Sequence, residues 1–337
     1  MANILVTGAA GFIGSSFAKK LHTKGHNLVL IDNLSFGNQD NFVDAPELFQ
    51  KMNFHDIRSS ESKSLYENID IVYHFAGISS LPECQANPLE SFSVNSAGTA
   101  NVFEYSRLHK VKKVVVASTA AVYENNSGGV HTENEEVDPF LIYSLSKKHA
   151  EDIAKSYGKV YGMDFVICRF FNVYGPHQDY QRPNPPFTSY LVKELLAGNV
   201  PTIFNVLDDK RDYIFIEDLM IYLEALIEKS FFNLPPVINF ASGNSYSPLE
   251  IFQMLCEILE VKGEYALGAS KYFWAKYTTL DQGFAISDSI LQKEIHKNAV
   301  STADSVKEFL SGHQTIGLEH GLRSIVAFQK NLNLWSS

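Results

Sequence analysis

The sequence predicts an α/β protein in which helices cover both faces of a doubly wound parallel sheet, followed by a smaller lobe. Three observations predict this class. Apolar runs of strand length alternate with longer helical patterns through about the first half of the chain. The first of these runs leads directly into a glycine-rich turn and a helix. Several later runs end in small or polar residues, which would gather at the carboxyl edge of the sheet.

The composition is that of a globular protein with a large core. The chain has 337 residues, 45% of them hydrophobic, which fits one large α/β unit or two closely packed lobes. Its formal net charge of -10, with scattered basic residues, disfavours binding to nucleic acid or to an anionic membrane. Neither a membrane span nor a signal peptide is recognised, so we expect a cytoplasmic protein. Cys84, Cys168 and Cys256 lie far apart and are expected to be reduced thiols without a metal.

The first predicted strand, Asn3 to Thr7, is followed by a turn containing three glycines and by a helical pattern through Leu21. Glycines here permit a tight bend and close approach of the backbone to a diphosphate, whose charge the helix N-terminus favours. Their spacing is one residue wider at the start than the commonest dinucleotide fingerprint. The turn therefore predicts a Rossmann-type dinucleotide site with contacts from Gly8, Gly11, Phe12, Ile13 and Gly14.

The second predicted strand, Asn27 to Ile31, ends at Asp32 and Asn33. A carboxylate at this place accepts hydrogen bonds from ribose hydroxyls and repels a 2′-phosphate, which favours NAD over NADP. A third strand is expected to end near Phe54 and a fourth to run from Ile69 to Phe75. Their tips supply further expected cofactor contacts: Asp56, Ile57, Phe75, Ala76 and Gly77.

A long helical pattern from Leu89 to His109 contains Asn95, and a valine-rich strand from Lys112 to Ala117 delivers Ser118 and Thr119 to the same edge. A Ser-Thr pair after a strand is more often a helix cap or a turn than a catalytic pair. A catalytic role of these hydroxyls is favoured by a second long helical pattern, which begins at Tyr143, 24 residues after Thr119.

Tyr143 precedes Lys147 by four residues, so a helix would place the phenol and the ammonium group on one face. An ammonium group beside a phenol lowers the pKa of the phenol, which suits a general acid or base. The spacing alone is common on solvated helices. The predicted strand ends that precede Tyr143 and Lys147 in the chain favour a catalytic role for this pair.

Together these segments resemble the extended short-chain dehydrogenase/reductases and, within them, the nucleotide-sugar epimerases. The likeness runs from residue 3 to about residue 220. The segments that carry it are Thr7-Gly8-Ala9-Ala10-Gly11-Phe12-Ile13-Gly14, Asp32-Asn33-Leu34, Asp56-Ile57, Asn95-Ser96-Ala97-Gly98-Thr99, Ser118-Thr119-Ala120-Ala121-Val122-Tyr123 and Tyr143-Ser144-Leu145-Ser146-Lys147.

The resemblance implies an NAD-dependent epimerisation at C4 of a UDP-hexose or UDP-N-acetylhexosamine. Tyr143 would remove the 4-hydroxyl proton while C4 gives its hydride to NAD, and both would return after the keto sugar turns. Thr119 would bind the same hydroxyl, and Lys147 would bind the nicotinamide ribose. Further implied cofactor contacts are Asn95, Ser118 and Phe170, and implied substrate contacts are Ser79, Thr119, Asn172, Phe204, Arg211 and Asp281.

The second half of the chain continues this organisation. A strand from Asp164 to Phe171 leads to a polar, proline-rich loop, and we place the domain boundary near residue 175. Residues 1–175 would form the NAD-binding domain, with returning elements from about 205 to 245, and 176–337 would mainly bind the nucleotide sugar. Arg211 resembles the family's diphosphate-binding arginine, with a surface pair with Asp212 as the alternative. Phe204 resembles an aromatic residue that contacts uracil, or is simply a core phenylalanine.

Two local departures narrow the expected chemistry. Sugar-nucleotide 4,6-dehydratases carry Asp-Glu after the threonine, whereas Ala120 and Ala121 cannot transfer protons, so dehydration is disfavoured. The family's C-terminal arginine is missing near Asp281, where Lys276 or another cation would substitute. The small Ala285 stands where some epimerases place a bulky residue that excludes N-acetylated sugars, so an acetylated substrate is expected to fit.

The sequence leaves several other functions open. The chain could be a UDP-hexuronate epimerase, an epimerase at C2 or C5, a reductase or a decarboxylase, all NAD-dependent. A non-catalytic NAD-binding sensor is disfavoured because Thr119, Tyr143 and Lys147 are all present. The helical patterns from Leu89 and Tyr143 resemble those that pair between subunits in the family, which implies a homodimer.

Overall fold

The computed structural model describes residues 1–337 except 127–128, 183–184, 205–206, 269–297, 311 and 333–337. The chain divides into two compact units, which are described separately. The sequence places the boundary near residue 175, whereas the structure divides the chain at 170 and also gives 123–138 to the second unit. Unit 1 is Met1–Val122, Pro139–Phe170 and Met220–Asn239, and unit 2 is Tyr123–Asp138, Phe171–Leu219 and Phe240–Ser337.

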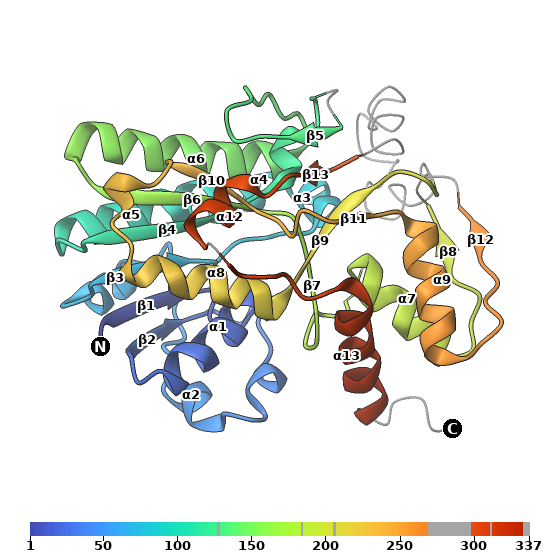
Figure 1. Cartoon of the computed structure of the whole chain (residues 1–337). Helices are drawn as coiled ribbons and strands as arrows, with labels where there is room; N and C mark the ends of the chain where they lie inside the picture. Colours follow the sequence, from blue (N-terminus) through green and yellow to red (C-terminus); the bar gives the residue numbers. More distant parts are fainter. Residues whose placement is uncertain (127–128, 183–184, 205–206, 269–297, 311, 333–337) are drawn as a thin grey trace. The chain divides into compact units, whose positions relative to one another are not determined.

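Unit 1 is built on a six-stranded sheet with the order β10-β6-β4-β3-β1-β2 (Figure 1). The pairings from β2 through β6 are parallel. Valines in β4 suit such a sheet because its central strands are buried on both faces. The doubly wound parallel sheet is thus confirmed, and β10 is the predicted returning strand. The strands are β1 (Asn3–Thr7), β2 (Asn27–Ile31), β3 (Ile71–His74), β4 (Lys113–Thr119), β6 (Asp164–Phe170) and β10 (Val237–Phe240).

Helices cover both faces of this sheet, as two neighbouring residues of β3 show. Tyr73 donates a hydrogen bond to the carbonyl oxygen of Leu223 of α8, and its ring packs at a tilt against that of Phe17 of α1, whereas His74 contacts Thr99 of α5. Successive strand residues point to opposite faces, so α1 and α8 lie opposite α5 (Figure 1). Helix α6 packs beside α5. These helices are α1 (Phe12–Thr23), α5 (Gly98–Leu108), α6 (Ile142–Tyr161) and α8 (Ile216–Glu228).

The structure corrects one sequence-based expectation in unit 1 and refines another. The segment before Phe54 forms no named strand and contributes only a bridge between Ile31 and Asn53. The expected helical segment from Leu89 to His109 is confirmed, and it contains a π-helical turn, η3 (Ser93–Ala97), between α4 and α5. The remaining elements are α2 (Pro46–Gln50), α3 (Leu81–Ala86) and α4 (Pro88–Phe92), with the 3₁₀ turns η1 (Gln39–Phe42), η2 (Ser60–Tyr66), η4 (Ala120–Tyr123) and η5 (Phe231–Asn233).

The described part of unit 2 contains three small sheets and several helices. The largest sheet has the order β11-β9-β7, with β7 parallel and β11 antiparallel to β9. Helix α9 begins with a capping box in which Ser247 and Glu250 bond each other's backbone N–H groups. The strands are β7 (Asn172–Tyr174), β9 (Arg211–Phe215), β11 (Ser245–Tyr246), β8 (Thr202–Ile203) with β12 (Ala266–Leu267), and β5 (Val130–His131) with β13 (Val300–Ser301). The helices are α7 (Phe187–Leu196), α9 (Pro248–Leu259), α12 (Asp304–Phe309) and α13 (Leu318–Asn331).

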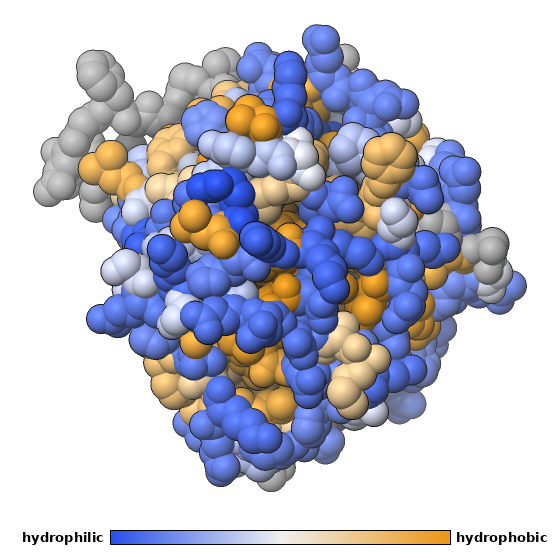
Figure 2. Space-filling model, turned by 90° about the vertical axis from the view of Figure 1, so that its left-hand side faces the viewer, coloured by the Kyte–Doolittle hydropathy of each residue, from blue (hydrophilic) through white to orange (hydrophobic). Residues whose placement is uncertain are grey.

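The surface in Figure 2 is mostly hydrophilic, with apolar residues in smaller groups between polar ones. Cys84, Cys168 and Cys256 are free thiols, as expected. Among the described residues, no helix combines the length and the apolar character that crossing a bilayer requires.

Candidate active site

The glycine turn between β1 and α1 has no space for side chains at two of its glycines. Gly8 has φ +67°, and a Cβ there would lie 2.6 Å from the backbone nitrogen of Ala76. A Cβ on Gly14 would overlap the carbonyl oxygen of Gly8. Gly11 is less crowded, since its Cβ would lie 3.3 Å from the same oxygen. The turn therefore packs α1 closely against the sheet, as the fingerprint predicts.

The N-terminus of α1 fits the diphosphate of a dinucleotide. No side chain caps this helix end, and no acidic residue lies in its first turn. Its first backbone N–H groups therefore carry the partial positive charge that an anion binds.

Asp32 lies beside this turn, at the end of β2. Its carboxylate accepts hydrogen bonds from the backbone N–H groups of Ala10, at 2.9 Å, and Leu34, at 2.7 Å. Burial raises the pKa of the carboxyl group, although these bonds oppose the rise. The turn and the carboxylate are thus held together, in the arrangement that suits a diphosphate and its ribose.

Asp56 is part of an ion-pair network that the sequence did not predict. Arg58 donates to both of its carboxylate oxygens, at 2.9 and 2.6 Å, and Asn33 donates at 3.2 Å. The hydrogen bond from Arg58 lowers the pKa of Asp56. Arg58 also reaches Glu90 and Ser93, so it links the tip of β2 to α4 and η3. The only sequence signal is the Asp-x-Arg spacing after a predicted strand.

A buried chain of hydrogen bonds crosses the sheet at His74. The Nδ1 atom lies 2.7 Å from the hydroxyl of Thr7, and Nε2 lies 2.9 Å from that of Thr99. Thr99 donates its hydrogen to the carbonyl oxygen of Asn95, so it must accept from Nε2–H. In the neutral ring Nδ1 is then the acceptor, so Thr7 donates its hydroxyl hydrogen to Nδ1 while its oxygen accepts from the backbone N–H of Ala76. The neutral Nε2–H tautomer satisfies every member of the chain.

Asn95 extends this chain to the helix that carries Tyr143. Its side-chain amide donates to the carbonyl oxygen of Ile78 and to the hydroxyl of Ser146, and its oxygen accepts from the N–H of Ile78. Ser146 in turn donates to the carbonyl oxygen of Tyr143. Asn95 therefore holds the tip of β3 to α6, and its predicted role as a cofactor contact stays a prediction.

We expect His74 to make the protein less stable in acid. Burial lowers the pKa of His74 to about 3, from 6.5 when unfolded, so only the unfolded state gains a proton between these values. From pH 7 to 5 this contributes a loss of about 2 kcal/mol in the free energy of unfolding. The variant His74→Gln is expected to be less stable at pH 7 but to lose about 2 kcal/mol less on acidification. Urea denaturation at pH 7 and pH 5 measures the loss of stability in each protein, with the exposed His22→Gln as control. Equal losses in wild type and His74→Gln would contradict the role of His74.

Thr119, Tyr143 and Lys147 all belong to unit 1. Thr119 ends β4, and its hydroxyl accepts a hydrogen bond from the N–H of Ala121 at 3.1 Å, which leaves the hydroxyl hydrogen to be donated. Tyr143, in the first turn of α6, is 9% exposed and packs with Ile78 in a cluster that Ala121 also contacts. The segment after Thr119 and the ring of Tyr143 therefore lie together.

Lys147 lies one turn further along the same helix face and is only 6% exposed. Burial lowers its pKa to about 8, so the ammonium form still dominates at neutral pH. A Cβ added to Gly77 would lie 2.9 Å from the side-chain oxygen of Asn95 and 3.8 Å from Nζ of Lys147. The tip of β3 thus lies close to both residues.

Other predicted unit 1 residues lie at the same sheet edge with differing surroundings. Phe170 ends β6 and is buried, with its ring centroid 6.4 Å from that of Phe75. Ser79 is exposed after the tip of β3. The hydroxyl of Ser118 points away from Thr119 and donates to the buried carboxylate of Glu151. Ile57 is buried and packs against Gly98.

The predicted substrate residues of unit 2 lie partly on one sheet. Asn172 on β7 donates to the carbonyl oxygen of Asp212 on β9 at 2.8 Å, next to Arg211. Both carboxylate oxygens of Asp212 accept backbone N–H bonds, from Ser242 and Gly243, and burial raises the pKa of Asp212 to about 6. Phe204 is half-buried. Lys276, Asp281 and Ala285 lie outside the described residues.

Comparison with known proteins agrees with this geometry. Residues 4–239 match the model of the NAD dependent epimerase/dehydratase family. A UDP-glucose 4-epimerase of Lacticaseibacillus casei is 31% identical over 267 residues, covering 74% of this chain and 78% of that protein.

Two solved structures share the fold over 98% of this chain and 99% of their own, each at 25% identity. One is a UDP-glucose 4-epimerase from Thermotoga maritima with UDP-glucose, at a TM-score of 0.83. The other is a UDP-N-acetylglucosamine 4-epimerase from Methanobrevibacter ruminantium in complex with UDP-N-acetylmuramic acid, at 0.81. The chain therefore belongs to the NAD dependent epimerase/dehydratase family, and NAD is its cofactor.

Proposed function

We propose that this enzyme epimerises a UDP-hexose or UDP-N-acetylhexosamine at C4. The observation that carries the proposal is the placement of Tyr143 and Lys147 on one face of α6, with the chain that follows Thr119 packed against the tyrosine. These three side chains supply a proton acceptor, a cation and a hydroxyl beside the sheet edge where the glycine turn and Asp32 fit NAD.

Tyr143, Lys147 and Thr119 have different roles in the proposed reaction. The phenol of Tyr143 takes the proton of the sugar 4-hydroxyl and later returns it, because the neighbouring ammonium group of Lys147 favours the phenolate. Thr119 donates its hydroxyl hydrogen to the same sugar oxygen and holds it in place. Bound NAD supplies the reversible hydride acceptor at C4. The Gly8–Gly14 turn, Asp32 and Lys147 would hold the cofactor.

Ala120 and Ala121 support epimerisation over dehydration. They follow Thr119 in the turn η4, and Ala121 packs against the cluster around Tyr143. A dehydration would need an acid and a base there to remove water, and methyl groups transfer no protons.

The substrate class is proposed from unit 2 and from the relatives. Arg211 would bind the diphosphate through paired hydrogen bonds, with Asn172 on the neighbouring strand. Relatives with this fold are named for UDP-glucose and for UDP-N-acetylglucosamine. Both sugar types are therefore candidates, as the small Ala285 also implies.

A substrate panel tests the proposal. The purified protein is denatured and the released nucleotide identified, and the native protein is then incubated with UDP-galactose, UDP-N-acetylgalactosamine and UDP-galacturonate. We expect released NAD and the interconversion of at least one of the first two with its C4 epimer, without change of mass and without accumulation of NADH.

Three other outcomes would contradict the proposal. Loss of water or carbon dioxide would identify a dehydratase or a decarboxylase, and turnover of UDP-galacturonate alone would identify a hexuronate enzyme. Bound NAD with no turnover of any sugar nucleotide in the panel would favour a sensor.

A further inference from the structure

Glu151 is a fully buried carboxylate on the helix that carries Tyr143 and Lys147. It follows Lys147 by four residues and therefore lies one turn further along the same face of α6. Its exposed fraction is 0%. A charge in such a place is costly unless it is paired, so its partners indicate its role.

Two strands of the sheet hold this carboxylate. Ser118 on β4 donates to Oε1 at 2.6 Å, and Arg169 on β6 donates to Oε1 at 2.9 Å and to Oε2 at 2.8 Å. Ser118 and Arg169 are direct neighbours in the register of β4 and β6, one residue before Thr119 and Phe170. Although burial opposes ionisation, Arg169 keeps the pKa of Glu151 below its ordinary value. Glu151 thus ties α6 to the strand end that delivers Thr119.

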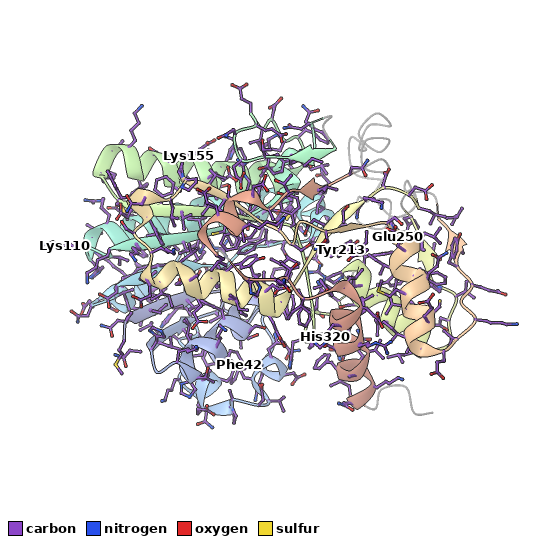
Figure 3. All side chains as sticks on the ribbon, viewed as in Figure 1. Phe42, Lys110, Lys155, Tyr213, Glu250 and His320 are labelled. Carbon is purple, nitrogen blue, oxygen red and sulfur yellow. The ribbon has the colours of Figure 1, made fainter. Side chains whose placement is uncertain are left out.

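The carboxylate of Glu151 lies between two lysines of α6, with Lys147 one turn before it and Lys155 one turn after it. Lys155, labelled on α6 in Figure 3, lies 3.8 Å from Oε2 and is half exposed. Lys147 lies on the opposite side along the helix, where burial works against its charge. Glu151 is a buried anion one helical turn from Lys147, so its charge favours the ammonium form. The other titratable groups near Lys147 are Tyr143 on α6, and Cys84 on α3 and His74 on β3, both uncharged at neutral pH.

We propose that Glu151 is a positioning residue that keeps Lys147 charged and fixes the catalytic helix to the tip of β4, acting from the interior without touching substrate. The inference rests on the role proposed for Lys147. Arg169 neutralises much of the negative charge of Glu151. The negative charge that remains lies one helical turn from Lys147 and stabilises the ammonium form of this second buried cation.

The experiment measures the titration of Lys147 in the whole 337-residue chain as purified, without substrate. The protein is labelled with [ε-¹³C]lysine, and the signal of Lys147 is identified by its loss in Lys147→Arg. The ¹³Cε shift is followed between about pH 6 and 10. In Glu151→Gln we expect the midpoint to fall by about one pH unit or more, because a favourable charge is lost from a buried site.

Matched variants separate charge from other effects. Asp152→Asn removes the same charge from the next residue of the same helix, on an exposed position paired with Lys148, and should leave the midpoint unchanged. Glu151→Asp keeps the charge and should hold the midpoint within about 0.3 pH unit of wild type.

Glu151→Gln leaves Arg169 buried without its carboxylate and could fail to fold. In that case the titration is done with the double variant Glu151→Gln/Arg169→Gln, in which both buried charges are removed and the two amide side chains can hydrogen-bond to each other. Its midpoint should also fall, since Glu151 lies one turn from Lys147 on the same helix, whereas Arg169 lies on β6. An unchanged midpoint in the folded single or double variant would overturn the inference. That result is independent of the substrate panel, because the titration requires no turnover.

Discussion

Tyr143→Phe is expected to lower the turnover of a UDP-sugar at least about 10²-fold while the protein still binds NAD. The change removes one oxygen atom from a ring that is 9% exposed and packs against Ile78 and Cys84, so the fold should persist. Without the phenol, the group proposed to exchange a proton with the sugar hydroxyl is missing, while Lys147 on the same face of α6 is retained. Turnover is measured with the substrate that the panel identifies, and NAD is measured after denaturation.

Tyr161→Phe is the matched control, because Tyr161 ends the same helix and is 54% exposed. It should leave turnover and NAD content unchanged. A Tyr143→Phe variant with wild-type turnover would refute the assigned role, whereas loss of NAD together with turnover would show that the ring acts in binding.

Gly14→Ala is expected to destabilise the fold by about 3 kcal/mol or more and to abolish NAD binding. The new methyl group would overlap the Gly8 carbonyl and lie 2.9 Å from Cα of Ala9, and both contacts are backbone atoms that no side-chain rotation can relieve. Relief requires α1 to move away from β1, which opens the turn. Urea denaturation of the NAD-free protein gives the stability, and fluorescence titration gives the affinity.

Gly11→Ala provides the comparison at the same turn. Its Cβ would meet only the Gly8 oxygen at 3.3 Å, and Gly11 has an ordinary φ of -74°, so NAD-free stability should change by less than about 1 kcal/mol. NAD affinity should nevertheless fall, because Gly11 is a predicted contact of the diphosphate. Wild-type stability in Gly14→Ala, or an equal loss in both variants, would contradict the packing argument.

The order of elements in unit 1 was largely predictable because it depends on local patterns. Strands Asn3–Thr7 and Asn27–Ile31 have the predicted bounds, and the long helix begins one residue before Tyr143. Apolar periodicity, glycine turns and the residues that end strands are all local signals. The strand expected before Phe54 was wrong, because this segment forms only a bridge between Ile31 and Asn53. The helical segment from Leu89 was confirmed, but its π-helical turn was not predicted. At Asn95 the bonds to Ile78 and Ser146 accompany a π turn that no period reveals.

By itself, the sequence determined the doubly wound parallel sheet, the glycine turn for NAD and the helical face that carries Tyr143 and Lys147. Each depends on spacing within about twenty residues. Only the tertiary structure decided how this edge is supported. His74 meets Thr7 across 67 positions, and Glu151 meets Ser118 across 33. Such pairs follow from the register of strands and the docking of helices, which bring together residues that no local pattern relates.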